Sequence, residues 1–236
     1  YPRDTEIIDA QYPNYLMKNY GFAEEFYRWG HGIVADLWTT RWQEMKSITL
    51  PLPSVYEQRR IIDALDTKCA QVDTLIANVQ AQIEKLKAYK QSLITEVVTK
   101  GLDPTVPMKD SGVEWIGSIP AHWEILNFKY ITTIKSNLVD PSQYLEYPQI
   151  SPENIEKGSG RLLPCRTVKE VGVESNNHLF FRGQIIYSKV RPILNKVTIA
   201  PFDGLCSADM YPIETGINKK YLVYLMLSNV FLTQVK

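Results

Sequence analysis

The sequence predicts an α+β protein in which globular portions lie at the two ends of one long coiled-coil α-helix. The helix is predicted because neither Gly nor Pro occurs between Ser54 and Lys100. At 1.5 Å per residue such a helix spans about 70 Å, whereas helices of globular domains seldom exceed roughly 20 residues. The flanks contain short runs of β-branched and aromatic residues bounded by Gly, Pro or Asn, which is typical of strands.

Both ends of the helix carry local signals. Ser54 is a suitable N-cap, and Glu57 three residues later completes a capping box. Pro51 and Pro53 precede the cap, where their missing N–H groups are not needed. Gly101 follows Lys100 and supplies the left-handed conformation that commonly ends a helix. The apolar connector residues beyond it, including Trp115 and Trp123, are expected to anchor the helix exit to the following domain.

One face of the helix repeats in heptads. Positions at alternating steps of three and four run unbroken from Gln58 to Val97, and nine of the twelve are apolar, as in a coiled-coil seam. The predicted coiled-coil interface consists of Ile62, Leu65, Val72, Ile76, Val79, Ile83, Leu86, Leu93 and Val97. The alternative is a helix that lies across the core of its own domain, and the length favours a partner helix instead.

The flanks divide the chain into further segments. We expect domain boundaries at residues 1–52, 53–101, 102–114 and 115–236, the third segment being a turn-rich linker. Strand-like runs occupy residues 126–134, 178–190 and 196–202. A weak repeat relates Tyr15-Leu16 to Tyr221-Leu222, with Tyr1-Pro2 matching Tyr211-Pro212. Since the chain starts without Met and stops in a helix-like stretch, we expect it to be a piece of something longer, beginning midway through one repeat and ending midway through the next.

Composition narrows the function classes. The 26 basic and 26 acidic residues balance, which gives no overall basic field for nucleic acid. Three scattered cysteines indicate reduced thiols and a cytoplasmic protein, and no apolar run reaches the length of a membrane span. Cys165, His178 and Cys206 could meet at a metal only through folding, and isolated core positions are the simpler interpretation. Without a P-loop, an HExxH or a paired-carboxylate pattern, we expect no catalytic residue, metal or cofactor.

Three stretches together carry a specific resemblance: LPLPSVYEQRRIIDALD, the helix continuation DTLIANVQAQIEKLKAYKQSLITEVVTKGLD, and DSGVEWIGSIPAHWE. They resemble the specificity subunits of type I restriction-modification systems. In that family two target-recognition domains each read one half of a split DNA sequence, and two long helices pack as an antiparallel coiled coil whose length fixes the gap.

The resemblance implies a non-catalytic subunit that binds double-stranded DNA and docks methyltransferase subunits and, through them, a restriction subunit. Residues 1–52 would then be the distal part of the first recognition domain, residues 53–101 the spacer helix, and residues 115–236 the opening and middle of the second domain. The seam would pair with a second long helix of the same subunit, or with a second copy in an antiparallel homodimer. The alternative is a coiled-coil scaffold without DNA affinity of its own.

Two segments are candidates for DNA contact. Between Arg161 and Lys196, seven Lys or Arg residues stand against two acids, and GQIIYSKVRPILNKV resembles a recurrent motif of the recognition domains. If this run is an extended strand, Lys189 and Arg191 share one face; the alternative is a solvated basic face. The second segment, residues 29–46, combines polar donors with three tryptophans, of which we expect at least two to be buried. The predicted DNA-binding residues are Thr39, Thr40, Arg41, Arg166, Arg182, Ser188, Lys189, Arg191, Asn195 and Lys196.

Overall fold

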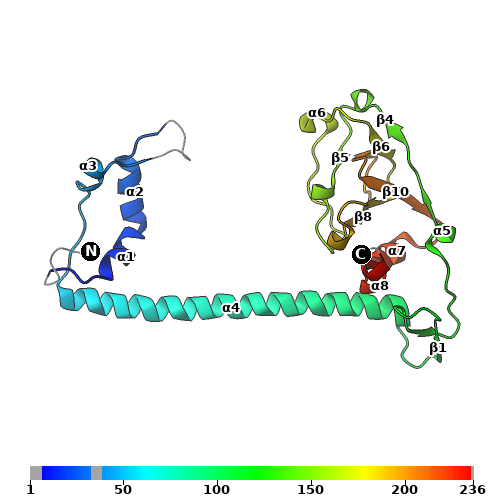
Figure 1. Ribbon diagram of the computed structural model, residues 1–236, viewed down its shortest axis with the longest axis horizontal. Helices are drawn as coiled ribbons and strands as arrows, with labels where there is room; N and C mark the ends of the chain where they lie inside the picture. Colours follow the sequence, from blue (N-terminus) through cyan, green and yellow to red (C-terminus); the bar gives the residue numbers. More distant parts are fainter. Residues whose placement is uncertain (1–6, 33–38, 235–236) are drawn as a thin grey trace. The chain divides into compact units, whose positions relative to one another are not determined.

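A computed structural model describes residues 7–32 and 39–234 (Figure 1). The chain divides into two compact units, residues 1–83 and 84–236, which we call the N-terminal unit and the C-terminal unit. Helix α4 (Val55–Lys100) contributes its first part to one unit and its last part to the other. In the part of the chain that the structure describes, no helix has both the length and the apolar character needed to cross a membrane.

Helix α4 has the predicted limits and runs for 46 residues. The capping box is present: the Glu57 N–H donates to Ser54 Oγ at 3.3 Å, and the Ser54 N–H donates to Glu57 Oε2 at 3.2 Å. Gly101 has φ +78°, and its N–H donates to the Val97 carbonyl at 3.0 Å. A Cβ at Gly101 would lie 3.4 Å from the ring of Trp123, so the connector packs against the helix exit as expected.

The N-terminal unit contains short helices and few buried side chains. Its helices before α4 are α1 (Tyr12–Met17), α2 (Tyr20–Arg28) and α3 (Trp42–Met45). Gln58 of α4 is fully buried: its Nε2 donates to the carbonyls of Ile7 and Pro53, and its Oε1 accepts from the Asp9 N–H at 2.8 Å. Gln58 therefore joins the chain before α1 to the start of α4.

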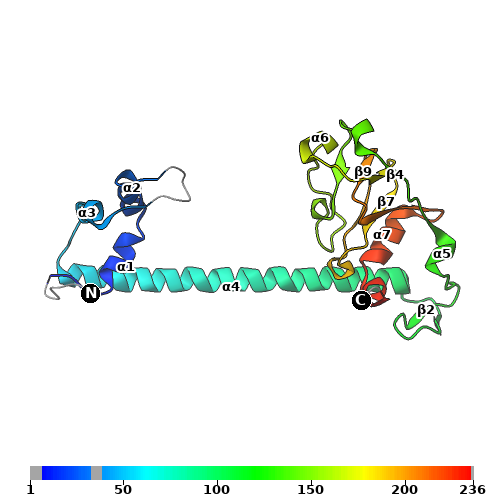
Figure 2. The ribbon, with the colours of Figure 1, turned by 45° about the horizontal axis from the view of Figure 1, so that its top comes forward.

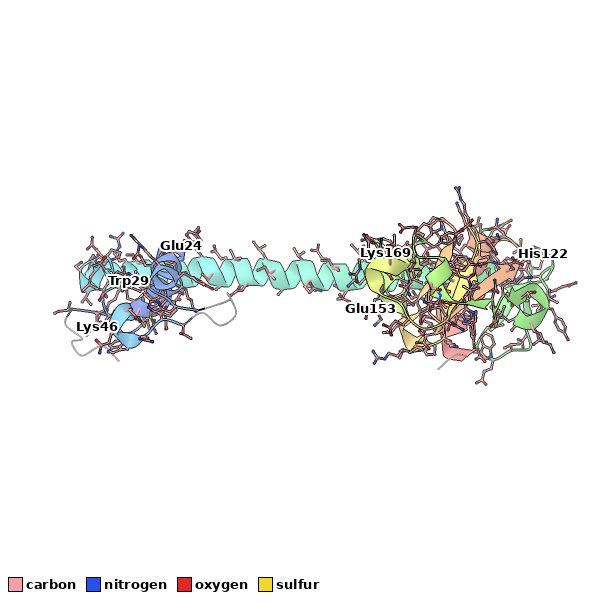
Figure 3. All side chains as sticks on the ribbon, turned by 90° about the horizontal axis from the view of Figure 1, so that it is seen from above. Glu24, Trp29, Lys46, His122, Glu153 and Lys169 are labelled. Atoms are coloured by element: carbon pink, nitrogen blue, oxygen red, sulfur yellow. The ribbon has the colours of Figure 1, made fainter. Side chains whose placement is uncertain are left out.

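Two tryptophans of this unit are exposed, so the prediction that at least two of the three would be buried is wrong. Trp29, which Figure 3 labels, is 42% exposed and Trp42 is 69% exposed, while Trp38 lies outside the described residues. Among the described residues of the unit, the buried apolar side chains are those of Tyr12 and Ile62. This core is too small to enclose two indole rings.

The C-terminal unit is built on two four-stranded sheets and a short hairpin (Figure 1). The hairpin pairs β1 (Met108–Asp110), inside the expected linker, with β2 (Ser118–Pro120). The first sheet is antiparallel, in the order β3 (Thr132–Ile134), β10 (Met210–Thr215), β7 (Ile185–Ser188), β8 (Val197–Ile199). The second has the order β4 (Leu138–Val139), β6 (Asn177–Phe180), β9 (Gly204–Cys206), β5 (Gln149–Ile150), with β5 parallel to β9.

Helices close the unit around these sheets. They are α5 (Phe128–Ile131), α6 (Val168–Val171), α7 (Lys219–Leu227) and α8 (Asn229–Gln234), with short 3₁₀ turns η2 (Pro141–Gln143), η3 (Pro152–Asn154) and η4 (Pro192–Leu194). The expected strand at residues 126–134 is therefore half helix, because α5 precedes β3. Figure 2 shows α7 beside the last turns of α4, where the Tyr221 hydroxyl donates to the Val98 carbonyl at 3.2 Å.

Strand β7 lies at the centre of the apolar core. Ile185 and Tyr187 belong to a cluster with the buried face of α7, whereas Ile186 belongs to a second cluster with Phe180 and Cys206. Alternate side chains of a strand point to opposite faces, so β7 is packed on both faces. The end of this strand is consequently a fixed platform for the residues that follow it.

Candidate nucleic-acid interface and helix-pairing surface

The segment from Lys189 to Asn195, here called the β7–β8 loop, is a closed loop and not a continuing strand. Strand β7 ends at Ser188, whose N–H donates to the Lys196 carbonyl at 3.0 Å. The prediction of an extended strand carrying Lys189 and Arg191 on one face is therefore wrong. Pro192 provides no N–H for a ladder bond and starts the 3₁₀ turn η4, so the chain reverses here.

The β7–β8 loop is held in an unusual backbone conformation. Arg191 (φ 50°) and Asn195 (φ 45°) flank η4 and are the non-glycine residues with positive φ in the described ranges 7–32 and 39–234. A non-glycine residue with positive φ raises the free energy of the folded state by about 1–3 kcal/mol, and it keeps this conformation only where the surrounding structure fixes it. Here the Ser188 hydroxyl donates to the Val190 carbonyl at 3.1 Å, and Lys196 Nζ donates to the Pro152 carbonyl at 2.6 Å.

The predicted contact residues of this loop differ in their access to solvent. Lys189 and Arg191 are exposed, and Lys189 Nζ lies 5.0 Å from the centre of the Tyr211 ring. Ser188 and Asn195 are 1% and 3% exposed. The amide of Asn195 makes no hydrogen bond with any residue that the structure describes.

Arg166 lies beside a separate cavity. It precedes α6, is exposed, and lines a cavity of about 390 Å³ together with Gln149, Glu153 and Pro152. Since Lys196 donates to the carbonyl of Pro152, the end of the β7–β8 loop adjoins this cavity. The structure therefore brings Lys196 near the cavity that Arg166 lines.

Arg182 is not brought to this surface. It lies in the turn between β6 and β7, at the opposite end of β7 from Lys189, and its N–H donates to Asp203 Oδ1 at 2.7 Å. A strand advances about 3.3 Å per residue, so the four residues of β7 separate the two positions.

In the N-terminal unit the three predicted residues have different roles. The Thr40 hydroxyl donates to the Phe26 carbonyl at 2.8 Å, and Thr39 pairs with His31 through its backbone. Arg41 is exposed beside Trp42, and its N–H donates to Glu44 Oε2 at 2.8 Å. Of these three residues, Arg41 is therefore the one that presents a positive charge to solvent.

The apolar stripe of α4 is buried at its beginning and exposed along its middle. Ile62 is 5% exposed, while Leu65 and Val97 are half-buried. The exposed fractions of the other six predicted seam residues are 53% for Val72, 61% for Ile76, 54% for Val79, 40% for Ile83, 66% for Leu86 and 45% for Leu93. Side chains stand out from these middle turns in Figure 3. Tyr89 is 66% exposed and lies just outside the stripe. The sequence prediction missed it because counting in heptads selects only the positions at the centre of the stripe.

Two of the three cysteines, Cys165 and Cys206, and the buried His178 belong to the core of the C-terminal unit, whereas Cys69 is exposed on α4. His178 lies opposite Cys206 across β6 and β9, and Cys165 packs against the same cluster. Burial raises the pKa of Cys206 to about 12 and lowers the pKa of His178. Across residues 7–32 and 39–234, no three His, Cys, Asp or Glu side chains are grouped as ligands for a metal ion.

Comparisons with known proteins give consistent relatives. No family model matches the chain. It is 36% identical over 203 residues to the type I restriction enzyme EcoDI specificity subunit of Escherichia coli, covering 80% of this chain and 46% of the relative. It is 25% identical over 205 residues to the MjaVIII specificity subunit of Methanocaldococcus jannaschii, covering 79% of this chain and 45% of the relative. The chain thus spans about half the length of the curated relatives it matches.

Solved structures share the fold. The crystal structure of the HsdS subunit from Thermoanaerobacter tengcongensis matches 98% of this chain and 55% of its own, with TM-score 0.52 and 12% identity. A structure described under complex assembly and conformational transition of the type I R-M system matches 94% of this chain and 53% of its own, with TM-score 0.54 and 14% identity. The fold of this chain, a long helix followed by a sheet-containing unit, is therefore shared with these two solved structures.

Proposed function

We propose that this chain recognises DNA sequence for a type I restriction enzyme, because it belongs to the specificity subunits of such enzymes. The observation that carries the proposal is the 36% identity to a named specificity subunit over four fifths of the chain. The shared fold of the HsdS structures supports it. The chain would not catalyse methylation or cleavage itself; methyltransferase and restriction subunits would do so.

Each unit would hold part of a recognition domain. Residues 1–52 would be the distal part of one domain, residues 115–236 the opening and middle of the next, and α4 the spacer between them. The exposed aromatic side chains of the N-terminal unit, such as Trp29 and Trp42, fit a domain whose remaining part is supplied from elsewhere.

DNA would meet the C-terminal unit through its exposed cations, with Lys189 and Arg191 on the β7–β8 loop and Arg166 beside the neighbouring cavity. Arg41 would contribute in the N-terminal unit. Ser188 and Asn195, which the sequence suggested as contacts, would instead shape the loop because both are buried. Arg182 lies at the other end of β7, away from this group of cations.

The exposed stripe of α4 would pair with a second long helix. Six large apolar side chains that are 40–66% exposed form a surface that water solvates unfavourably. The partner would be a second long helix of the same subunit or a second copy of the chain packed antiparallel.

A salt series tests the proposal against the scaffold alternative. We expect the chain with its methyltransferase subunits to bind random duplex DNA with an affinity that falls linearly on a log–log plot against salt. Lys189→Ala should weaken binding and reduce that slope by about 1 for a lost phosphate contact, whereas Lys220→Ala, at an exposed position of α7, should not. A scaffold without DNA affinity would show no salt-dependent binding.

A further inference from the structure

The tip of the β7–β8 loop presents one arginine in a rigid frame. Arg191 is exposed, and its guanidinium makes no hydrogen bond or ion pair with any described residue. Its backbone has φ 50°, a conformation that glycine would adopt more easily. A non-glycine residue in such a strained conformation is a reason to look for a function of its side chain.

The frame around Arg191 is fixed from several sides. The loop is closed by the bond from the Ser188 N–H to the Lys196 carbonyl, and the Lys189 N–H donates to the Asp209 carbonyl at 3.0 Å. At the far end of the loop, the Gly158 N–H donates to the Asn195 carbonyl at 3.2 Å. Because the backbone of the loop is fixed, the Arg191 side chain leaves it in a defined direction. A contact to phosphate alone does not require such a fixed direction.

The neighbours of Arg191 are apolar. Val190, next to Arg191 in the chain, is 42% exposed, and Ile193, two positions beyond it, is 59% exposed, so the same loop also presents aliphatic surface to solvent. A surface that meets only phosphate oxygens is normally polar, whereas base edges in the major groove include thymine methyl groups that apolar side chains contact. The adjacent cation, Lys189, has its Nζ 5.0 Å from the centre of the Tyr211 ring, so it already has a partner within the unit.

From this arrangement we propose that Arg191 is a base-reading residue: its guanidinium donates two hydrogen bonds to the O6 and N7 atoms of one guanine in the major groove. The planar fork of arginine matches these two acceptors in a fixed geometry, whereas lysine presents a compact charge on a flexible stem. Val190 and Ile193 contact the neighbouring base edges. This inference rests on the proposed function and assigns to one residue the sequence preference at one position of the target.

The test selects binding sites from a randomised duplex library with the complex of the chain and its methyltransferase subunits. Wild type is expected to select a motif containing one guanine whose preference is lost in Arg191→Lys, with discrimination at that position falling roughly 10- to 100-fold. Affinity for random DNA should change little, because the charge is kept. Arg161→Lys, an exposed arginine of the same unit, should leave the motif unchanged.

A second variant separates reading from folding. Arg191→Gly relieves the positive φ, so the variant should unfold at a temperature no lower than wild type and yet lose the guanine preference. If Arg191→Lys keeps the motif and Arg191→Ala weakens binding equally for all sequences, Arg191 is a phosphate contact and the inference is overturned. If the wild-type complex selects no motif and binds without salt dependence, the proposed function itself fails.

Discussion

Replacing Ile76 by aspartate should dissociate the helix pair. Ile76 is 61% exposed, and complete burial of such a side chain contributes about 1.5–3 kcal/mol. Each copy therefore has about 1–2 kcal/mol to gain by covering it, and an antiparallel dimer loses about 2–4 kcal/mol, or roughly 30- to 1000-fold in dissociation constant. An unpaired carboxylate inside the seam weakens the pair further because it must be desolvated.

Sedimentation velocity across a concentration series measures this effect. The matched control is Ala81→Asp, which adds the same charge to an exposed position on the opposite face of α4. We expect the control to sediment as wild type, and circular dichroism should show equal helix content in both variants. The reasoning is refuted if Ile76→Asp dimerises as tightly as wild type, or if the wild-type chain is a monomer throughout the series.

Three further predictions concern the cores of the two units. Gln58→Leu removes three hydrogen bonds of about 1 kcal/mol each, so the N-terminal unit should lose about 3 kcal/mol and the amide of Asp9 should exchange faster with deuterium. At pH 8, iodoacetamide should modify exposed Cys69 but not Cys206, because burial raises the pKa of Cys206 to about 12. Burial holds the pKa of His178 below its ordinary value of 6.5, so as the pH falls His178 is protonated in the unfolded chain before it is protonated in the folded chain. Urea titrations should therefore show that stability falls as the pH drops below about 6.5.

Each of these predictions has its control. Gln71→Leu, at an exposed position of α4, should leave the exchange of the Asp9 amide unchanged; equal exchange in Gln58→Leu and wild type would contradict the bonding role. Modification of Cys206 in the folded protein at the rate of Cys69 would show that it is accessible. His178→Gln should flatten the stability curve between pH 6.5 and 5, and an unchanged curve would assign the dependence to other groups.

The sequence predicted the limits of α4 because the signals are local. The Ser54–Glu57 capping box and the positive φ of Gly101 depend on residues close in the chain. Gln58 was placed on the heptad seam by its spacing, yet the structure uses it to join the chain before α1 to α4. Spacing along a helix identifies a face but not which neighbour covers it.

The β7–β8 loop could not be derived from local pattern. The alternation around Lys189 and Arg191 fits a strand, but the course of the chain there depends on bonds to Asp209 and Pro152, which are distant in sequence. Asn195 is buried as well, and its carbonyl accepts from the N–H of Gly158, which is also distant in sequence. Residue types therefore indicated the right segment, whereas only tertiary contacts decide which side chains face solvent.

The most direct test of the account changes the length of α4. Duplicating the heptad of residues 72–78 lengthens the helix by about 10 Å while leaving the sequences before and after that heptad unchanged. Methylated sites mapped in cells that carry the chain with its partner subunits should then show the same two half-site sequences separated by a longer gap. An unchanged gap, or altered half-site sequences, would contradict the role of α4 as the spacer between two base-reading units.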